Sequence, residues 1–357
     1  MLLVVKPFSR EMEREIRMDR VLADALAGVD VQYLLTAEAL AETDLRNRKI
    51  LFAVCLSEAG VNLEYYRMLE HFRQHPGCLK GAAGVILVDG SGDLFTKSLA
   101  RRLAFSANLA GCTFPGRPLV EATGSLYNFQ TLSRINAVSC EEAYAMQVKL
   151  LVKRILDYVP YESCGRNILV VHASSRKSSN SLLLWEKIRS RLYEPEGERS
   201  ITEISLRNGH MTDCRGCRYE TCLHYGEQGS CFYGGIMTDQ VYPAIISCDT
   251  LVMICPNYND AVGANITAFI NRLTSVFRTN DFSGKRVFAI VVSGYSGGDI
   301  VAEQIIGAMN LNKGFILPGN FALMETANDP KSVLKIDGID EKAAGFAAQI
   351  AGKMKAV

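Results

Sequence analysis

The sequence has no excess of charge of either sign. Its 357 residues include 39 Lys and Arg and 38 Asp and Glu, which gives a formal net charge of +1. Surfaces that bind nucleic acid or anionic membranes normally need a basic excess, so this near-neutrality argues against both kinds of partner. We therefore expect neither a nucleic acid nor a membrane among the partners of this protein.

Long apolar runs are also missing. No stretch reaches the roughly 18 apolar residues of a membrane-spanning helix, and the apolar start at residues 1–5 is too short for the core of a signal peptide. These absences predict a cytoplasmic protein. Hydrophobic residues make up 48% and charged residues 22% of the chain, which is a globular rather than a disordered composition. The length predicts about two domains.

Cysteine, in contrast, is plentiful, with eleven residues. A disulfide framework is not expected in a reducing compartment, so a cluster of cysteines indicates metal or redox chemistry. Four of the eleven, Cys214, Cys217, Cys222 and Cys231, lie within one short segment, residues 214–231. Four thiolates complete the ligand set of a [4Fe–4S] cluster or of a structural zinc. Unligated thiols are the third interpretation.

Apolar runs alternate with helical periodicity in both halves of the chain, which predicts parallel sheets covered by helices. In the second half we expect strands at residues 167–173, 201–206, 251–255, 287–293 and 321–324, and helices at 181–192, 262–277, 300–309 and 341–355. In the first half we expect strands at residues 2–5, 31–35, 50–55, 85–88 and 118–122, and helices at 10–26, 63–74, 95–109 and 140–158. Each half therefore predicts a doubly wound α/β domain with a five-stranded sheet.

A local correspondence indicates that the two halves are copies of one domain. In both halves an apolar strand, a Gly/Ser turn and a helix precede a Pro-Gly pair, Pro115-Gly116 in the first and Pro318-Gly319 in the second. Self-similarity at about half the chain length is the pattern of a duplication. We expect domains at residues 1–160 and 166–357, joined by a linker at 160–165.

The segment HASSRKSSNS, residues 172–181, lies between a predicted buried strand and a predicted helix. A helix N-terminus attracts a phosphate through its free backbone N–H groups, and hydroxyl and amide side chains add donors around it. An ordinary helix cap would need only one such side chain. The segment therefore predicts a phosphate-binding loop.

This strand, loop and helix resemble the FMN-phosphate loop of the flavodoxin-like NADPH-dependent FMN reductases and iron–sulfur flavoproteins. The resemblance extends from about residue 166 to the C-terminus, and it implies flavodoxin-like domains. It further implies that the FMN phosphate is held, without metal, by Ser174, Arg176, Ser179, Asn180 and Ser181.

Two further loops follow predicted strands and would lie at the same sheet edge, where ligands of open α/β sheets bind. For these loops the expected flavin-binding residues are Pro256, Asn257, Tyr258 and Asn259 in one and Gly294, Tyr295, Ser296 and Gly297 in the other. An aromatic can stack on the flavin ring, and glycines let the backbone approach it. The family pattern has a Lys and an Asp-Arg pair on the helix after the first of these loops; this chain keeps Arg272 but has Thr267 and Asn271.

Iron–sulfur flavoproteins carry a compact four-cysteine loop at this point in the fold, with tighter spacing than residues 214–231. The resemblance thus implies a [4Fe–4S] cluster near the flavin. The first half lacks the corresponding features, because its first strand is followed by Lys6-Pro7 and a single hydroxyl, Ser9, and its third by a turn with Glu58 and no aromatic. We expect the first domain to be a degenerate copy without FMN.

Together these features predict an FMN-dependent oxidoreductase, either an NAD(P)H-dependent FMN or quinone-type reductase or a flavin electron carrier served by a ferredoxin. The alternative is a non-catalytic flavodoxin-like binding or scaffold protein with structural zinc or free thiols in the cysteine loop. We expect a homo-oligomer or an intramolecular pseudo-dimer, in which the degenerate copy covers the flavin.

Overall fold

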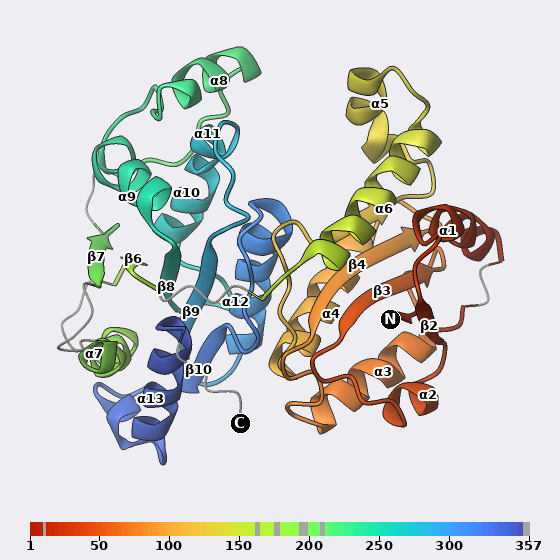
Figure 1. Ribbon diagram of the computed structural model, residues 1–357. Coiled ribbons are helices and arrows are strands. Elements are labelled where there is room, and N and C mark those ends of the chain that lie inside the picture. Colours follow the sequence, from red (N-terminus) through yellow and green to blue (C-terminus); the bar gives the residue numbers. More distant parts are fainter. Residues whose placement is uncertain (10–11, 161–164, 175–178, 193–198, 208–210, 353–357) are drawn as a thin grey trace. The chain divides into compact units, whose positions relative to one another are not determined.

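The computed structural model describes residues 1–9, 12–160, 165–174, 179–192, 199–207 and 211–352. The chain divides into two compact units. Unit 1 comprises Met1–Val159 and Leu317–Asn320, and unit 2 comprises Pro160–Ile316 and Phe321–Val357. Each unit contains a five-stranded parallel sheet with helices packed against it (Figure 1).

The sheet of unit 1 has the strand order β2-β1-β3-β4-β5. Its strands are β1 (Leu2–Val5), β2 (Val31–Leu34), β3 (Lys49–Leu56), β4 (Ala83–Gly90) and β5 (Leu119–Ala122). Its helices are α1 (Met12–Ala25), α2 (Ala37–Ala41), α3 (Leu63–Gln74), α4 (Thr96–Leu109), α5 (Gln130–Asn136) and α6 (Cys140–Asp157). The central strands β3 and β4 are buried along their length because helices cover both of their faces.

The sheet of unit 2 has the order β10-β9-β8-β6-β7, which is the same topology read from the other edge. Its strands are β6 (Asn167–His172), β7 (Ser200–Ser205), β8 (Thr250–Pro256), β9 (Arg286–Ser293) and β10 (Ala322–Thr326). Its helices are α7 (Asn180–Leu192), α8 (Tyr219–Glu227), α9 (Tyr242–Ser247), α10 (Ala264–Arg272), α11 (Thr274–Phe277), α12 (Gly298–Ile305) and α13 (Ile339–Ile350), with π-helical turns at Met237–Val241 and Ile306–Asn312. When the strands of each unit are numbered 1 to 5 in chain order, both sheets have the strand order 2-1-3-4-5, which is the flavodoxin-like arrangement. The predicted pair of doubly wound five-stranded domains is confirmed.

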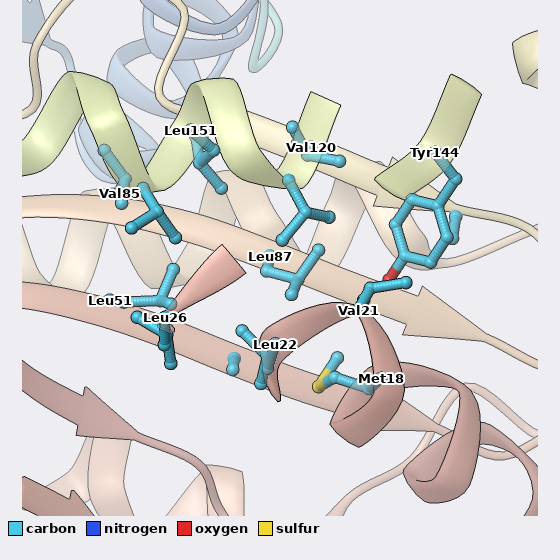
Figure 2. Close-up of a cluster of buried hydrophobic side chains, with 14 of the residues drawn as sticks. Met18, Val21, Leu22, Leu26, Leu51, Val85, Leu87, Val120, Tyr144 and Leu151 are labelled. Atoms are coloured by element: carbon cyan, nitrogen blue, oxygen red, sulfur yellow. The ribbon is translucent and has the colours of Figure 1, made fainter. Parts of the chain in front are cut away.

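The core of unit 1 illustrates how these layers are held. Met18 and Leu22 on α1 and Leu151 on α6 point onto β3 and β4, where they meet Leu51 and Leu87 (Figure 2). All five side chains are buried. Non-directional burial of apolar area of this kind fixes α1 and α6 on one face of the sheet.

The two Pro-Gly segments that indicated a duplication lie beside each other inside unit 1. Phe114 and Leu317 form an antiparallel bridge, in which each backbone N–H donates to the other's carbonyl at 2.9 Å. The Asn108 amide also donates to the Pro318 carbonyl at 2.6 Å. Leu317–Asn320 therefore belongs structurally to unit 1, although it falls within residues 166–357 of the sequence.

Candidate functional site

In unit 2, three loops meet at the carboxyl edge of the sheet, after β6, β8 and β9. Strands β6 and β8 are neighbours, although β7 separates them in the sequence, so the connections after them diverge at this point. Such a switch of direction leaves a crevice outside the strand ends, where open α/β sheets bind ligands.

The loop after β6 carries the predicted phosphate-binding hydroxyls. Ser174 is buried, and the Oγ atoms of Ser179 and Ser181 lie 2.9 Å apart at the start of α7. Ser181 is 1% exposed. Arg176 lies outside the described residues. The Ser179 and Ser181 hydroxyls thus lie where α7 begins and where the free N–H groups of its first turn are located.

Asn180, the first residue of α7, uses its side chain in another way. Its Nδ2 donates to the carbonyls of Ala327 and Asp329, at 3.0 and 2.9 Å. The side chain therefore ties the start of α7 to the loop after β10. Because the side-chain amide is engaged there, Asn180 can donate to a phosphate only through its backbone N–H.

The loop after β8 is a tight hairpin that presents Tyr258. The Tyr258 and Ala261 backbones pair, and the two residues between them, Asn259 and Asp260, have φ values of 53° and 56°. Two positive φ values in succession define a type I′ turn, a conformation that Asn and Asp tolerate. The turn leaves the Tyr258 side chain 60% exposed at the sheet edge.

The loop after β9 is locked to this hairpin. The Asn257 Nδ2 donates to the Ser296 carbonyl at 2.7 Å and to Asp260 Oδ1 at 3.2 Å. Gly297 has a φ of +83°, and a Cβ there would lie 2.0 Å from Asp260 Oδ1. Only glycine fits this approach, so Gly297 allows the two predicted flavin loops to pack together.

Tyr295 projects from the same loop and is 81% exposed. Its hydroxyl accepts a hydrogen bond from the Asn328 amide at 3.2 Å. Asn328 follows β10 and was not among the predicted site residues, because a lone Asn after a short strand gives no signal in the sequence. The hydroxyl thus positions Tyr295, and its exposed ring can contact a ligand.

Several buried polar atoms at this edge have no partner within the described part of the chain. They are His172 Nδ1, Asn180 Oδ1, Asn257 Oδ1 and Ser293 Oγ. Buried polar groups normally form hydrogen bonds, and a cluster without them indicates a polar ligand. The donors and acceptors of this edge, together with its two exposed tyrosine rings, fit the phosphate and the ring of FMN.

The four predicted metal ligands are placed in a segment that crosses α8. Cys214 is exposed, Cys217, Cys222 and Cys231 are half-buried, and Cys222 lies inside α8. Within the described ranges, no three His, Cys, Asp or Glu side chains are gathered to hold one metal ion. The structure therefore does not bring the four thiols together, and the expected cluster gains no support from their geometry.

Two adjacent residues of α10 hold the ends of this segment. The Asn271 Nδ2 donates to Asp213 Oδ1 at 3.0 Å, and the Arg272 Nη2 donates to the Gly234 carbonyl at 2.8 Å. From the sequence, Asn271 was recognised only as a departure from the family pattern. Residues 213–234, which we call the cysteine segment, are thus tied to unit 2 at both ends.

The same edge in unit 1 is filled by ion pairs. Lys6 Nζ, just after β1, pairs with Glu15 and Asp19 of α1. Arg17 pairs with Asp89, a fully buried residue of β4, and its Nη2 donates to the Thr123 carbonyl at 3.0 Å. Acidic side chains thus pair with Lys6 and Arg17 at this edge of unit 1. This arrangement explains physically why a phosphate is not expected there.

Within the described residues, no helix is long and apolar enough to cross a bilayer. No curated protein matches the chain significantly. One similar solved structure is the FMN-dependent NADH-azoreductase of Bacillus anthracis str. Ames Ancestor in complex with FMN. It has 14% sequence identity and a TM-score of 0.36, and the match covers 52% of this chain and 98% of that one. Another is the NADH:FMN oxidoreductase EMOB in its apo form, with 13% identity, a TM-score of 0.35, and coverage of 53% of this chain and 90% of that one. A third is the Trp repressor binding protein from Bacillus subtilis, with 17% identity and a TM-score of 0.35; the match covers 50% of this chain and 96% of that one.

The family comparison concerns the second half of the chain alone. The model of the NADPH-dependent FMN reductase family matches residues 166–329, which contain all three loops of the candidate site and the cysteine segment. Over residues 166–329 the chain therefore matches the model of the NADPH-dependent FMN reductase family, in the half of the chain where the resemblance was noted.

Proposed function

We propose that unit 2 binds FMN at the carboxyl edge of its sheet and that the protein is an FMN-dependent NAD(P)H oxidoreductase. The observation that carries the proposal is the set of buried polar atoms at the ends of β6, β8 and β9 for which the described residues offer no hydrogen-bond partner, inside the region matched by the reductase family.

In this proposal the loop after β6 anchors the phosphate. Ser174, Ser179 and Ser181 offer hydroxyl donors, and the first turn of α7 offers backbone N–H groups and its positive end. Arg176 is proposed as a cationic partner on the strength of the family resemblance. The Asn180 side chain keeps the loop after β10 against this anchor.

The other two loops hold the ring. Pro256–Asn259 presents the Tyr258 ring as a stacking surface, and residues 294–297 present backbone N–H groups and the Tyr295 ring. The bound flavin supplies the hydride chemistry, and the protein positions and tunes it. In this account no side chain acts as a general acid or base.

The electron donor that fits the family is NAD(P)H, and the acceptor is a second flavin or a quinone-type small molecule. Reduction by a ferredoxin is the other form of the proposal. We also propose the cysteine segment as a thiolate metal site, with a [4Fe–4S] cluster ahead of zinc. The homo-oligomer or intramolecular pseudo-dimer stays a prediction.

Anaerobic purification of the full chain, with a visible spectrum and with flavin, iron, sulfide and zinc analysis, tests these proposals together. Flavin bands that NAD(P)H bleaches support the reductase. Flavin that only a reduced ferredoxin bleaches supports the carrier. A colourless protein that gains no flavin from added FMN contradicts the proposed function.

A further inference from the structure

The carboxyl edge of the sheet in unit 1 presents apolar side chains to solvent. The connections that follow β1, β3, β4 and β5 each carry at least one large apolar side chain that is between 44% and 73% exposed. Single exposed apolar residues are ordinary on protein surfaces, whereas several on adjoining loops indicate an interaction site. We call the set the edge patch, and its members are Phe8, Val61, Leu63, Leu94, Phe95 and Tyr127.

The four connections are joined to one another, so the edge patch is continuous. The Asn62 side-chain amide donates to the Pro7 carbonyl at 3.4 Å, which joins the connections after β1 and β3. The Gly124 backbone N–H donates to the Gly92 carbonyl at 3.2 Å, which joins the connections after β4 and β5. The remaining junction, between the connections after β3 and β4, is a direct contact of a ring with a glycine.

This contact lies between Phe95 and Gly60. A Cβ at Gly60, whose φ is +70°, would lie 2.4 Å from the Phe95 ring. Phe95 itself has a φ of 74°, a conformation that a bulky residue rarely adopts. Such backbone strain persists only where the surrounding structure maintains it, and it is concentrated at functional positions. The chain thus holds an aromatic ring at the surface in a conformation that folding alone disfavours.

The charged side chains at this edge bind one another. Asp89, near the end of β4, accepts hydrogen bonds from Arg17 Nε at 2.8 Å and from the Tyr144 hydroxyl at 3.3 Å. At the same edge of unit 2, in contrast, several buried polar atoms have no partner among the described residues. An edge whose ion pairs are internal and whose surface is apolar fits a protein partner better than a charged cofactor.

The area of the edge patch is sufficient for a protein interface. An aromatic side chain presents about 150–250 Å², so the exposed fractions of Phe8, Phe95 and Tyr127 alone amount to roughly 300–450 Å². One side of a stable interface buries about 800 Å², of which somewhat more than half is apolar. The leucines and the valine of the patch add to the aromatic area. The patch therefore supplies the apolar area that one face of a stable dimer needs.

The charges around the edge patch indicate which partner it takes. Glu58 and Asp93 are exposed in the connections after β3 and β4, and Arg67 and Lys97 are exposed on the helices that follow them. An anionic membrane would require a basic excess, which is not present here. A surface with both signs can face a copy of itself, because a two-fold contact sets each charge against charges of the same set.

We propose that the edge patch is the two-fold contact of a homodimer, in which unit 1 of one copy packs against unit 1 of a second copy. The contact lies within unit 1 and does not depend on the proposed flavin site in unit 2. It gives the copy of the domain that is not expected to bind FMN a role in assembly.

Sedimentation velocity of the full chain over a range of concentrations tests this proposal. Leu63→Glu and Leu94→Glu place a carboxylate in two different connections of the edge patch, and Leu150→Glu, at an exposed position of α6, is the matched control. The dissociation constant of the wild-type dimer should rise by at least about a hundredfold in each patch variant, because an unpaired charge is costly to bury. The control should dimerise as the wild type does. Circular dichroism and FMN uptake should stay unchanged in all three variants, since the replaced side chains are exposed.

Crosslinking locates the contact independently. Unlabelled chains are mixed with ¹⁵N-labelled chains and treated with a lysine-specific crosslinker, so that links between labelled and unlabelled peptides report only contacts between copies. Such links should include Lys97, which lies beside the edge patch and has a side chain 80% exposed. They should not include Lys153, an equally accessible lysine near the C-terminal end of α6.

Each outcome decides the proposal. A dimer that both patch variants dissociate and the control preserves supports it. A wild type that stays monomeric at every concentration overturns it, as an intramolecular pairing of the two units would require. A dimer that persists in either patch variant, or that links through Lys153, places the contact elsewhere and also overturns it. Wild-type binding to phosphatidylserine vesicles that both patch variants lose would identify a lipid surface as the occupant instead.

Discussion

The Asn257 side chain donates to the Ser296 carbonyl at 2.7 Å and thereby joins the loops that follow β8 and β9. These loops are separated in sequence by α10 and α11 and by strand β9. Their connection fixes Tyr258 and Tyr295 at one sheet edge. The proposed ring site depends on this connection more than on any single contact with the ring.

We predict that Gly297→Ala disrupts the ring site. The new methyl would meet Asp260 Oδ1, and Gly297 has a positive φ that costs about 1–2 kcal/mol for an L-residue. FMN affinity should fall at least tenfold and the melting temperature should drop. Gly284→Ala is the matched control, because no described atom lies near its added methyl. Equal FMN affinity in the two variants would argue against the loop connection.

We predict that Ser181→Ala weakens FMN binding through the phosphate. The buried Oγ pairs with that of Ser179, so its loss removes a donor at the start of α7 and costs about 1 kcal/mol or more. Fluorescence titration with FMN and with riboflavin, which lacks the phosphate, isolates the effect. Affinity should fall for FMN and stay unchanged for riboflavin, and Ser190→Ala, on the exposed side of α7, should alter neither. A similar loss for both ligands would place the phosphate elsewhere.

We predict that His172 makes unit 2 less stable in mild acid. Burial lowers the pKa of His172 below the ordinary 6.5, while the Glu203 charge opposes the shift. The unfolded chain then binds more protons than the folded one, so this contribution is present above the unfolded pKa and is lost as the pH falls below about 6.5. Urea unfolding at pH 7.5 and pH 5.5 should show a smaller loss in His172→Gln than in the wild type. An identical loss would show that other groups cause it.

We predict that the ion pair in unit 1 behaves as a buried pair. Asp89 is fully buried, and desolvation raises its pKa even though Arg17 acts in the opposite direction. Arg17→Met leaves this carboxylate unpaired and should destabilise unit 1 by about 3–5 kcal/mol. The double variant Arg17→Met with Asp89→Leu should recover part of the loss in denaturant unfolding. A double variant as unstable as the sum of the single ones would contradict a coupled pair.

The sequence was sufficient for the regular part of the fold. Buried strands such as Arg286–Ser293 are continuous apolar runs between turn residues, and helix α3 (Leu63–Gln74) lies at its predicted limits. Such elements are specified by local pattern, and helices and strands of this type follow from periodicity. Two copies of this pattern were enough to predict two sheets of the same topology.

The parts that could not be predicted depend on tertiary contacts. Helix α8 contains glycine, cysteine and aromatic residues without a clear apolar face, and residues of α11 hold it, with the Ser275 hydroxyl donating to the Ser230 carbonyl just beyond its end. The continuous helix expected at 262–277 is instead divided at Leu273 into α10 and α11. The assignment of Leu317–Asn320 to unit 1 depends on its pairing with Phe114, which no local pattern encodes.

The loops of the candidate site were predicted from the sequence, but the hydrogen bonds that connect them to distant segments were not. Hydroxyl-rich and glycine-rich turns after strands are visible in one sequence, whereas the partners of Asn180, Asn328 and Arg272 lie far away along the chain. Cysteine spacing identified a possible ligand set but could not determine whether the thiols converge.

The most direct test of the central claim is the FMN stoichiometry of the cofactor-stripped full chain, measured by equilibrium titration and followed by anaerobic addition of NADPH and NADH. The account predicts one FMN per chain, held by unit 2 and reduced by a nicotinamide. No bound FMN would contradict the proposed site, and two per chain would contradict the interpretation of unit 1 as a copy that no longer binds the cofactor.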